Sequence, residues 1–201
     1  MNHLAHFYLS FEQEQLLVGN YMADFAKGSS YLTLPPEIQQ GVLLHRFIDH
    51  FTDNHPLVGK SKARISKIQG KFTPIVMDVF YDYLLATHWN LYSKEPLSVF
   101  AKNRYQQLNN HKILFPEPLL LRFEHMKTHD WLSNYATIYG IERALTGLSN
   151  RAKFENEMGN SIQLLLKYEV DLANDFNQFF PIIIEACQKQ INSMALVAEI
   201  Q

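Results

Sequence analysis

With 201 residues, 47% of them apolar and 19% charged, the chain is long enough for one sizeable hydrophobic core. Its formal net charge of −2 excludes the strongly basic field of a non-specific nucleic-acid-binding protein. The single cysteine, Cys187, excludes an internal disulfide and is typical of a reducing compartment, and no segment is apolar over the length of a membrane span. We therefore expect one domain over residues 1–201, in the cytoplasm, with no membrane span and no bound nucleic acid.

Apolar residues recur at helical spacing between breaks that contain glycine or proline, and alternating runs of β-branched residues are scarce. The predicted fold class is therefore all-α, an irregular helical bundle. Pro181 is expected in the first turn of the last helix, where its missing N–H is tolerated. The pattern predicts helices at 2–10, 12–27, 36–53, 57–69, 73–93, 96–110, 117–138, 140–146, 151–180 and from about 181 to the end.

Polar residues interrupt the first two predicted helices. Gly19 and Asn20 are unfavourable inside a helix, which predicts close packing or a ligand near the backbone there. Asp24 follows one turn later; a lone acid near a helix end is usually a surface group, so Asp24 is informative only together with other acids. His6 lies on a short apolar helix, where a histidine is more often a hydrogen-bonded core residue than a ligand.

The predicted helix at 36–53 places His45, Asp49 and Asp53 one turn apart along one side. An imidazole beside two carboxylates on one face is typical of a metal site. The alternative is a solvated polar face, but no lysine on this helix matches the acids.

The predicted helix at 73–93 is apolar on most sides, which is typical of a central helix, yet it carries Asp78 and Asp82 one turn apart and His88 near its end. Two like charges at this spacing destabilise a helix unless a cation lies beside them. The alternative is that one aspartate is an N-terminal helix residue and the other pairs with an arginine.

Buried imidazoles and carboxylates need partners, and a divalent metal satisfies several at once. The chain has no Gly-rich phosphate loop, no serine-hydrolase elbow and no paired cysteines, so these chemistries have no support. The pattern therefore favours a metal-dependent helical hydrolase.

Several spaced blocks of these residues, in order over the first 90 residues, resemble the acyl carrier protein phosphodiesterase family. The resemblance implies an enzyme that removes 4′-phosphopantetheine from holo-acyl carrier protein, giving the apo-carrier. It also implies a bundle distantly similar to HD-domain phosphohydrolases and a divalent cation, most often Mn²⁺, with Mg²⁺ as the alternative. The blocks are Met1 to His6, Gly19-Asn20 with Asp24, Leu44 to Asp49, Phe51 to Pro56 and Asp78 to Trp89.

On this resemblance we expect Asp24, His45, Asp49 and Asp82 to hold the metal, since carboxylates with imidazoles suit Mn²⁺ or Mg²⁺. Arg46 is expected to clamp the phosphate. His6, His55 and His88 are candidates for protonating the leaving group, because imidazole transfers protons near neutral pH. Asp53 completes the predicted catalytic set.

A basic run with no acidic residue lies between the two polar helices. Acyl carrier proteins are strongly acidic, so this run predicts a docking surface for that partner, while the alternative is an ordinary solvated helix face. The cations are Lys60, Lys62, Arg64, Lys67 and Lys71.

Two other functions fit the same pattern. One is an HD-type phosphohydrolase acting on a small nucleotide such as a guanosine polyphosphate, which needs an enclosed base pocket instead of a docking surface. The other is a non-catalytic helical interaction module, which predicts no turnover and little effect of substituting Asp24 or His45.

Overall fold

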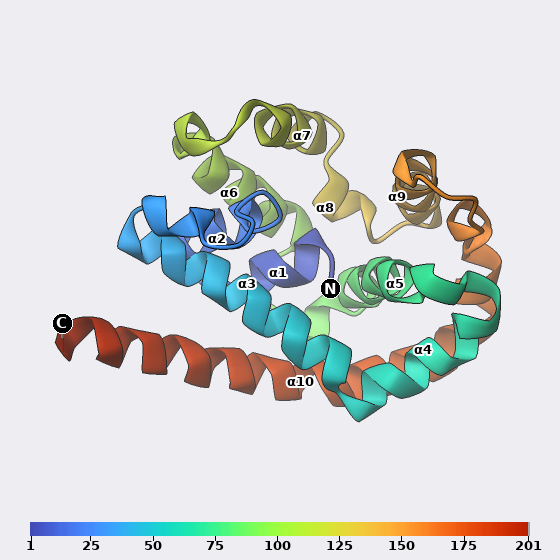
Figure 1. The fold of residues 1–201 in the computed structure, drawn as a ribbon. Helices are drawn as coiled ribbons and strands as arrows, with labels where there is room; N and C mark the ends of the chain where they lie inside the picture. The colour runs from blue at the N-terminus through green and yellow to red at the C-terminus, as the bar shows by residue number, and fades with distance from the viewer. Residues whose placement is uncertain (201) are drawn as a thin grey trace.

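The computed structural model describes residues 1–200, except for the side chains of Ala195 and residues 197–200. The described chain contains helices and no strand, as Figure 1 shows, which confirms the all-α prediction. The α-helices are α1 (His3–Tyr8), α2 (Glu14–Met22), α3 (Pro36–Asn54), α4 (Pro56–Gln69), α5 (Thr73–Thr87), α6 (Leu97–Asn110), α7 (Glu117–Thr128), α8 (Trp131–Asn134), α9 (Ile138–Arg151) and α10 (Ile162–Ile200). Short 3-10 helices are η1 (Ser30–Thr33), η2 (Gly70–Phe72), η3 (Trp89–Leu91), η4 (Lys112–Leu114) and η5 (Met158–Asn160).

Helix α1 and the N-terminus lie in the middle of the molecule (Figure 1), where α1 packs against α2 and α5. Leu4, Ala5 and Phe7 are fully buried, and so is most of α5, as expected for a central helix. The short first helix is therefore held by its apolar side chains and not by its length. Because it is central, α1 carries His6 into contact with helices far along the chain.

Several predicted helix boundaries are wrong: the helix predicted to start at 151 starts at Ile162, and the one predicted over 73–93 ends at Thr87. The segment 117–138 is not one helix, because Asp130 adopts a left-handed conformation (φ 42°) that ends α7 and starts the short α8. The predicted break at Pro181 is absent, and α10 continues through it. A proline inside a helix costs about 3 kcal/mol, but Phe179, Phe180 and Ile183 around it are fully buried in the core, and their burial offsets that cost.

Helices α2 and α3 cross at very close range through Gly19 and Gly41. A Cβ added at Gly19 would lie 2.0 Å from the carbonyl oxygen of Ile38, and one added at Gly41 would lie 2.4 Å from that of Leu16. Any larger residue would push the helices apart. This confirms the predicted close packing at Gly19 and brings its neighbour Asn20 against α3. Among residues 1–200, no helix has the length and apolarity needed to cross a membrane.

Candidate metal centre

Side chains from three helices meet where two histidines contact one asparagine. The Oδ1 of Asn20 on α2 lies 2.8 Å from Nδ1 of His6 on α1 and 2.9 Å from Nδ1 of His45 on α3. The two imidazole rings stack with their centroids 4.2 Å apart. The Nδ2 of Asn20 donates to the carbonyl of His6 and to Ser10 Oγ, which fixes which end of the amide faces the rings. Since Oδ1 only accepts, both Nδ1 atoms carry the proton.

Both Nε2 atoms then point at one carboxylate. His6 Nε2 lies 3.1 Å from Asp49 Oδ1, and His45 Nε2 lies 3.1 Å from Asp49 Oδ2. Burial lowers the pKa of His6 to about 4, assisted by the neighbouring His45, so His6 is neutral at pH 7. A neutral ring that donates from Nδ1 presents a bare lone pair to the carboxylate. A cation between these atoms would accept the nitrogen lone pairs and balance the carboxylate.

Asp49 is suited to that cation. Its side chain is 44% exposed, and each of its two oxygens faces one Nε2 atom. One ligand atom each from His6, His45 and Asp49 lies within 4.8 Å of the others, and no other such group occurs in the described part of the chain. Two imidazole nitrogens and a carboxylate oxygen that share one small space fit a divalent metal.

A cavity of about 260 Å³ lies beside this cluster. It is lined by the three residues of the cluster and by further carboxylates, Asp24, Asp53 and Asp78. Asp24 Oδ1 is 3.7 Å from His45 Nε2, and its other oxygen is 3.4 Å from Arg122 Nη1. The structure thus brings Asp24, His45 and Asp49 of the predicted metal ligands together, with His6 beside them.

Asp82, the fourth predicted metal ligand, does not line this cavity. Its side chain is fully buried and accepts hydrogen bonds from the backbone N–H groups of Leu4 at 2.7 Å and Ala5 at 3.1 Å. Burial raises the pKa of Asp82 to about 7. Both carboxylate oxygens are therefore engaged in holding the first turn of α1, the helix that carries His6.

Arg46, the predicted phosphate clamp, is turned toward the connection between α2 and α3. Its guanidinium donates to the carbonyls of Ala26 at 2.9 Å and Gly28 at 2.8 Å and lies over the ring of Tyr31. These contacts hold the connection in place. They leave Arg46 outside the residues that line the cavity.

The other predicted proton donors also lie elsewhere. His55 caps α4, with Nδ1 accepting from the N–H of Leu57, and packs against the ring of Phe179. His88 Nδ1 is 3.0 Å from the carbonyl of Leu84 at the end of α5. Neither lines the cavity, whereas Asp53 does, although it is paired with Lys62 at 2.6 Å.

The basic run on α4 and η2 is largely paired. Lys60 Nζ lies 3.0 Å from the buried Asp175 of α10, and Arg64 donates to the same carboxylate. Lys62 pairs with Asp53, and Lys71 lies over the ring of Phe154 at 3.5 Å from its centroid. Asp175 and Phe154 come from distant parts of the chain and Asp53 from the preceding helix, so the sequence of the basic run alone did not reveal them.

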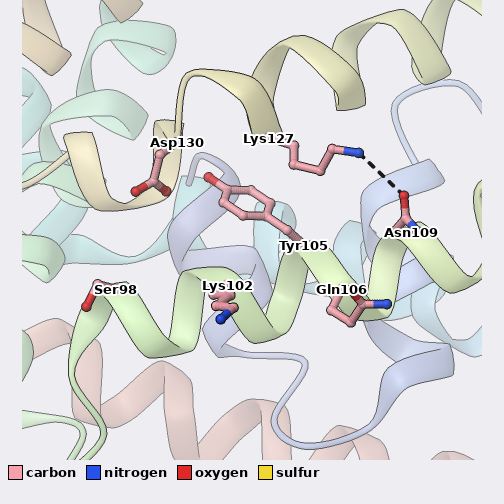
Figure 2. A pocket seen from close by; sticks show the side chains of 7 residues that line it. All are labelled: Ser98, Lys102, Tyr105, Gln106, Asn109, Lys127 and Asp130. Carbon is pink, nitrogen blue, oxygen red and sulfur yellow. Dashed lines mark hydrogen bonds between the residues drawn. The ribbon is translucent and has the colours of Figure 1, made fainter.

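A second hollow, of about 370 Å³, has a different lining (Figure 2). Lys127 donates to Asn109 Oδ1 at 3.4 Å, and Tyr105 accepts a hydrogen bond from the N–H of Leu132. With no imidazole and one carboxylate, this lining does not resemble a metal site. Its residues are Ser98, Lys102, Tyr105, Gln106, Asn109, Lys127 and Asp130.

The sequence of residues 1–183 matches the acyl carrier protein phosphodiesterase family. The chain belongs to this family. An acyl carrier protein phosphodiesterase of Yersinia pestis is 31% identical over 193 residues, covering 95% of this chain and 100% of the relative. Relatives of the same name from Enterobacter sp. (strain 638) and Photorhabdus laumondii are 31% and 28% identical, covering 95% and 94% of this chain and 100% and 96% of the relative. No solved structure matches the chain, so the similarity to HD-domain phosphohydrolases stays a prediction.

Proposed function

We propose that this protein is a metal-dependent phosphodiesterase that removes 4′-phosphopantetheine from holo-acyl carrier protein. The observation that carries the proposal is the convergence of His6 Nε2, His45 Nε2 and the Asp49 carboxylate beside a cavity. The family provides the substrate class, since its members are named for action on acyl carrier protein. The same substrate class favours the cytoplasm as the site of action.

We assign the metal to His6, His45 and Asp49, with Asp24 as a further acidic group at the edge of the site. Imidazole donors favour Mn²⁺ over Mg²⁺, while the carboxylates suit both. A bound divalent metal supplies Lewis acidity at a phosphodiester and makes water a nucleophile at neutral pH. In this assignment His6 is a metal ligand, not the proton donor expected from the sequence.

Hydrolysis breaks the bond between phosphorus and the serine oxygen of the carrier, and the phosphate stays on the pantetheine. Asn20 orients both imidazoles, which is the usual role of a group hydrogen-bonded to a metal-binding histidine. Arg122, next to Asp24, is the guanidinium best placed to receive a phosphate oxygen. Asp53 remains a candidate for proton transfer at the edge of the cavity.

We propose that the basic run on α4 and η2 contributes less to binding of the carrier than its sequence indicates. Four of its five cations already contact carboxylates or an aromatic ring within the protein. Lys67 is the fifth, and it is exposed. Docking on this face would therefore depend on Lys67 and on exchange of the existing ion pairs.

A turnover assay tests the proposal. Holo-acyl carrier protein is incubated with the protein, with and without Mn²⁺, and the carrier mass is followed for loss of the phosphopantetheine group, with Asp49→Ala in parallel. We expect metal-dependent loss that is absent in the variant. An intact carrier in the presence of bound metal would contradict the proposal and direct the search to free nucleotides. Absence of metal binding would leave a helical interaction module.

A further inference from the structure

A larger cavity, of about 630 Å³, adjoins the candidate metal centre. The two cavities share Asn2, His3, Asp24 and Leu148, so they are continuous at the end where Asp24 lies. The larger one extends along α7, α8 and α9, the helices that follow one another around the N-terminus in Figure 1. We call it the α9 groove. Its volume is within the range of small-ligand sites.

Three arginines and two acids, Asp24 and Glu142, line this groove. Arg122 is 3.4 Å from Asp24, whereas Arg143 and Arg151 have no carboxylate within 4 Å among the side chains that the structure describes. Arg122 and Arg151 both line the groove, and partial burial together with the like charge of Arg122 lowers the pKa of Arg151. Two guanidinium groups on one cavity favour an anion such as a phosphate.

The groove also has surfaces for an uncharged chain. Trp131 and Tyr139 offer aromatic faces, Leu148 is apolar, and Asn134 offers an amide for hydrogen bonding. A ligand that joins a phosphate to a neutral amide chain would match these surfaces. Phosphopantetheine is such a molecule: a phosphate ester, a dimethyl group, two amides and a thiol.

We propose that the α9 groove binds the pantetheine arm of the substrate, with Arg122 and Arg151 at the phosphate. This inference rests on the proposed function, and it adds where the arm lies and which residues select it. The alternative occupant, an acidic helix of the carrier itself, would meet the same arginines. It would leave the aromatic walls and the depth of the groove unused.

Gly147 permits a blocking variant. It lines the groove, and the nearest atom to an added Cβ is Arg151 Nη1 at 3.9 Å, so a side chain enters the groove without a backbone clash. Gly140 does not, since its Cβ would lie 2.0 Å from the carbonyl oxygen of Asn134. The test variant is therefore Gly147→Trp. Ile113→Trp places the same side chain at a position that is 91% exposed and outside the groove.

Binding of free 4′-phosphopantetheine is measured by isothermal titration calorimetry, because each variant adds a tryptophan to Trp89 and Trp131 and so changes the fluorescence by itself. KM and kcat on holo-carrier are measured in parallel. We expect Gly147→Trp to weaken phosphopantetheine binding and raise KM at least about tenfold, and Ile113→Trp to change neither. Unchanged binding in a folded Gly147→Trp protein would overturn the inference.

Arg151→Gln keeps the test open if Gly147→Trp does not fold, since Arg151 is exposed. It is expected to weaken phosphopantetheine binding about tenfold and to leave binding of pantetheine, which lacks the phosphate, unchanged. Equal loss of apo-carrier binding in Gly147→Trp would show a protein-docking groove and contradict the arm site. Phosphopantetheine binding without carrier turnover would contradict the proposed function alone.

Discussion

Asp49 and Asp175 are both carboxylates on helices packed into an apolar bundle, but their surroundings differ. Asp175 is fully buried and meets Ser61 Oγ at 3.1 Å, Lys60 Nζ at 3.0 Å and the guanidinium of Arg64. The Asp49 side chain is 44% exposed and meets two imidazole nitrogens, each at 3.1 Å. The charge of Asp175 is balanced by a lysine and an arginine in direct contact, whereas the nearest permanent cation to Asp49 is the amino group of Met1, at 3.9 Å.

This difference separates a structural carboxylate from a ligand. A carboxylate balanced by lysine and arginine has no need of an external partner, so it contributes to folding. A partly exposed carboxylate that faces two imidazole nitrogens across a cavity offers a set of ligand atoms to a cation. The first two sets of variants below each change the surroundings of one of these carboxylates and leave the other unchanged.

The largest effect is expected for His45→Ala compared with His55→Ala. Loss of His45 removes a metal-facing nitrogen and should lower turnover of holo-carrier by at least about 100-fold. Loss of His55 removes a helix cap, which costs about 1 kcal/mol of stability and leaves turnover near wild type. Steady-state assays and chemical denaturation of both variants check this. Equal activity of the two variants would contradict the assignment.

Asp175→Ala should act on stability alone. The substitution leaves the charge of Arg64 without its buried partner. It should therefore lower the free energy of unfolding by about 3–5 kcal/mol. Affinity for Mn²⁺ should not change. The matched control is Asp171→Ala, since Asp171 is 62% exposed and its pair with Arg64 is 3.8 Å long, so it should cost less than about 1 kcal/mol. Urea denaturation without metal distinguishes the two.

Asp82 predicts a pH dependence of stability. Its pKa is about 7 in the folded protein against a usual value of 3.8, so the folded state binds the proton more tightly than the unfolded state. The stabilisation is fully present below about pH 4 and is lost as the pH rises through about 7, in total on the order of a few kcal/mol. The free energies of unfolding of wild type and Asp82→Asn are measured in EDTA across this pH range. The difference between the two proteins should change with pH as described. A difference independent of pH would contradict the raised pKa.

The smallest effect is expected at the crossing of α2 and α3. Gly19→Ala places a Cβ against the carbonyl of Ile38 and should cost about 1–3 kcal/mol, while displacing Asn20 and weakening Mn²⁺ binding. Gly59→Ala, on an exposed helix with no neighbour within 4 Å, should stabilise by about 0.5–1 kcal/mol. Thermal unfolding and metal titration of the pair measure both effects.

Much of the helical pattern was predictable because apolar spacing and breaks are local. The predicted helix at 36–53 is nearly α3, and His45 and Asp49 were identified as partners because they are one turn apart. The continuation of α10 through Pro181 was not, because burial of distant side chains outweighs the local cost of the proline.

Long-range contacts limited the prediction of the site. In the sequence, Asp49 and Asp82 each lie one helical turn after another polar residue. Only the packing of α1 shows that Asp82 accepts hydrogen bonds from backbone N–H groups. Asn20 drew notice as an unfavourable helix residue, but its role as acceptor for two imidazoles depends on three helices meeting.

The most direct test of the account is Mn²⁺ binding to the purified protein, followed by electron paramagnetic resonance and calorimetry. The account predicts that wild type binds Mn²⁺ and that His6→Ala and His45→Ala each lose it, while Asp175→Ala keeps it. Binding by His45→Ala with the affinity and spectrum of wild type would show that the metal, if any, lies elsewhere, and would contradict the assignment of His6, His45 and Asp49 as its ligands.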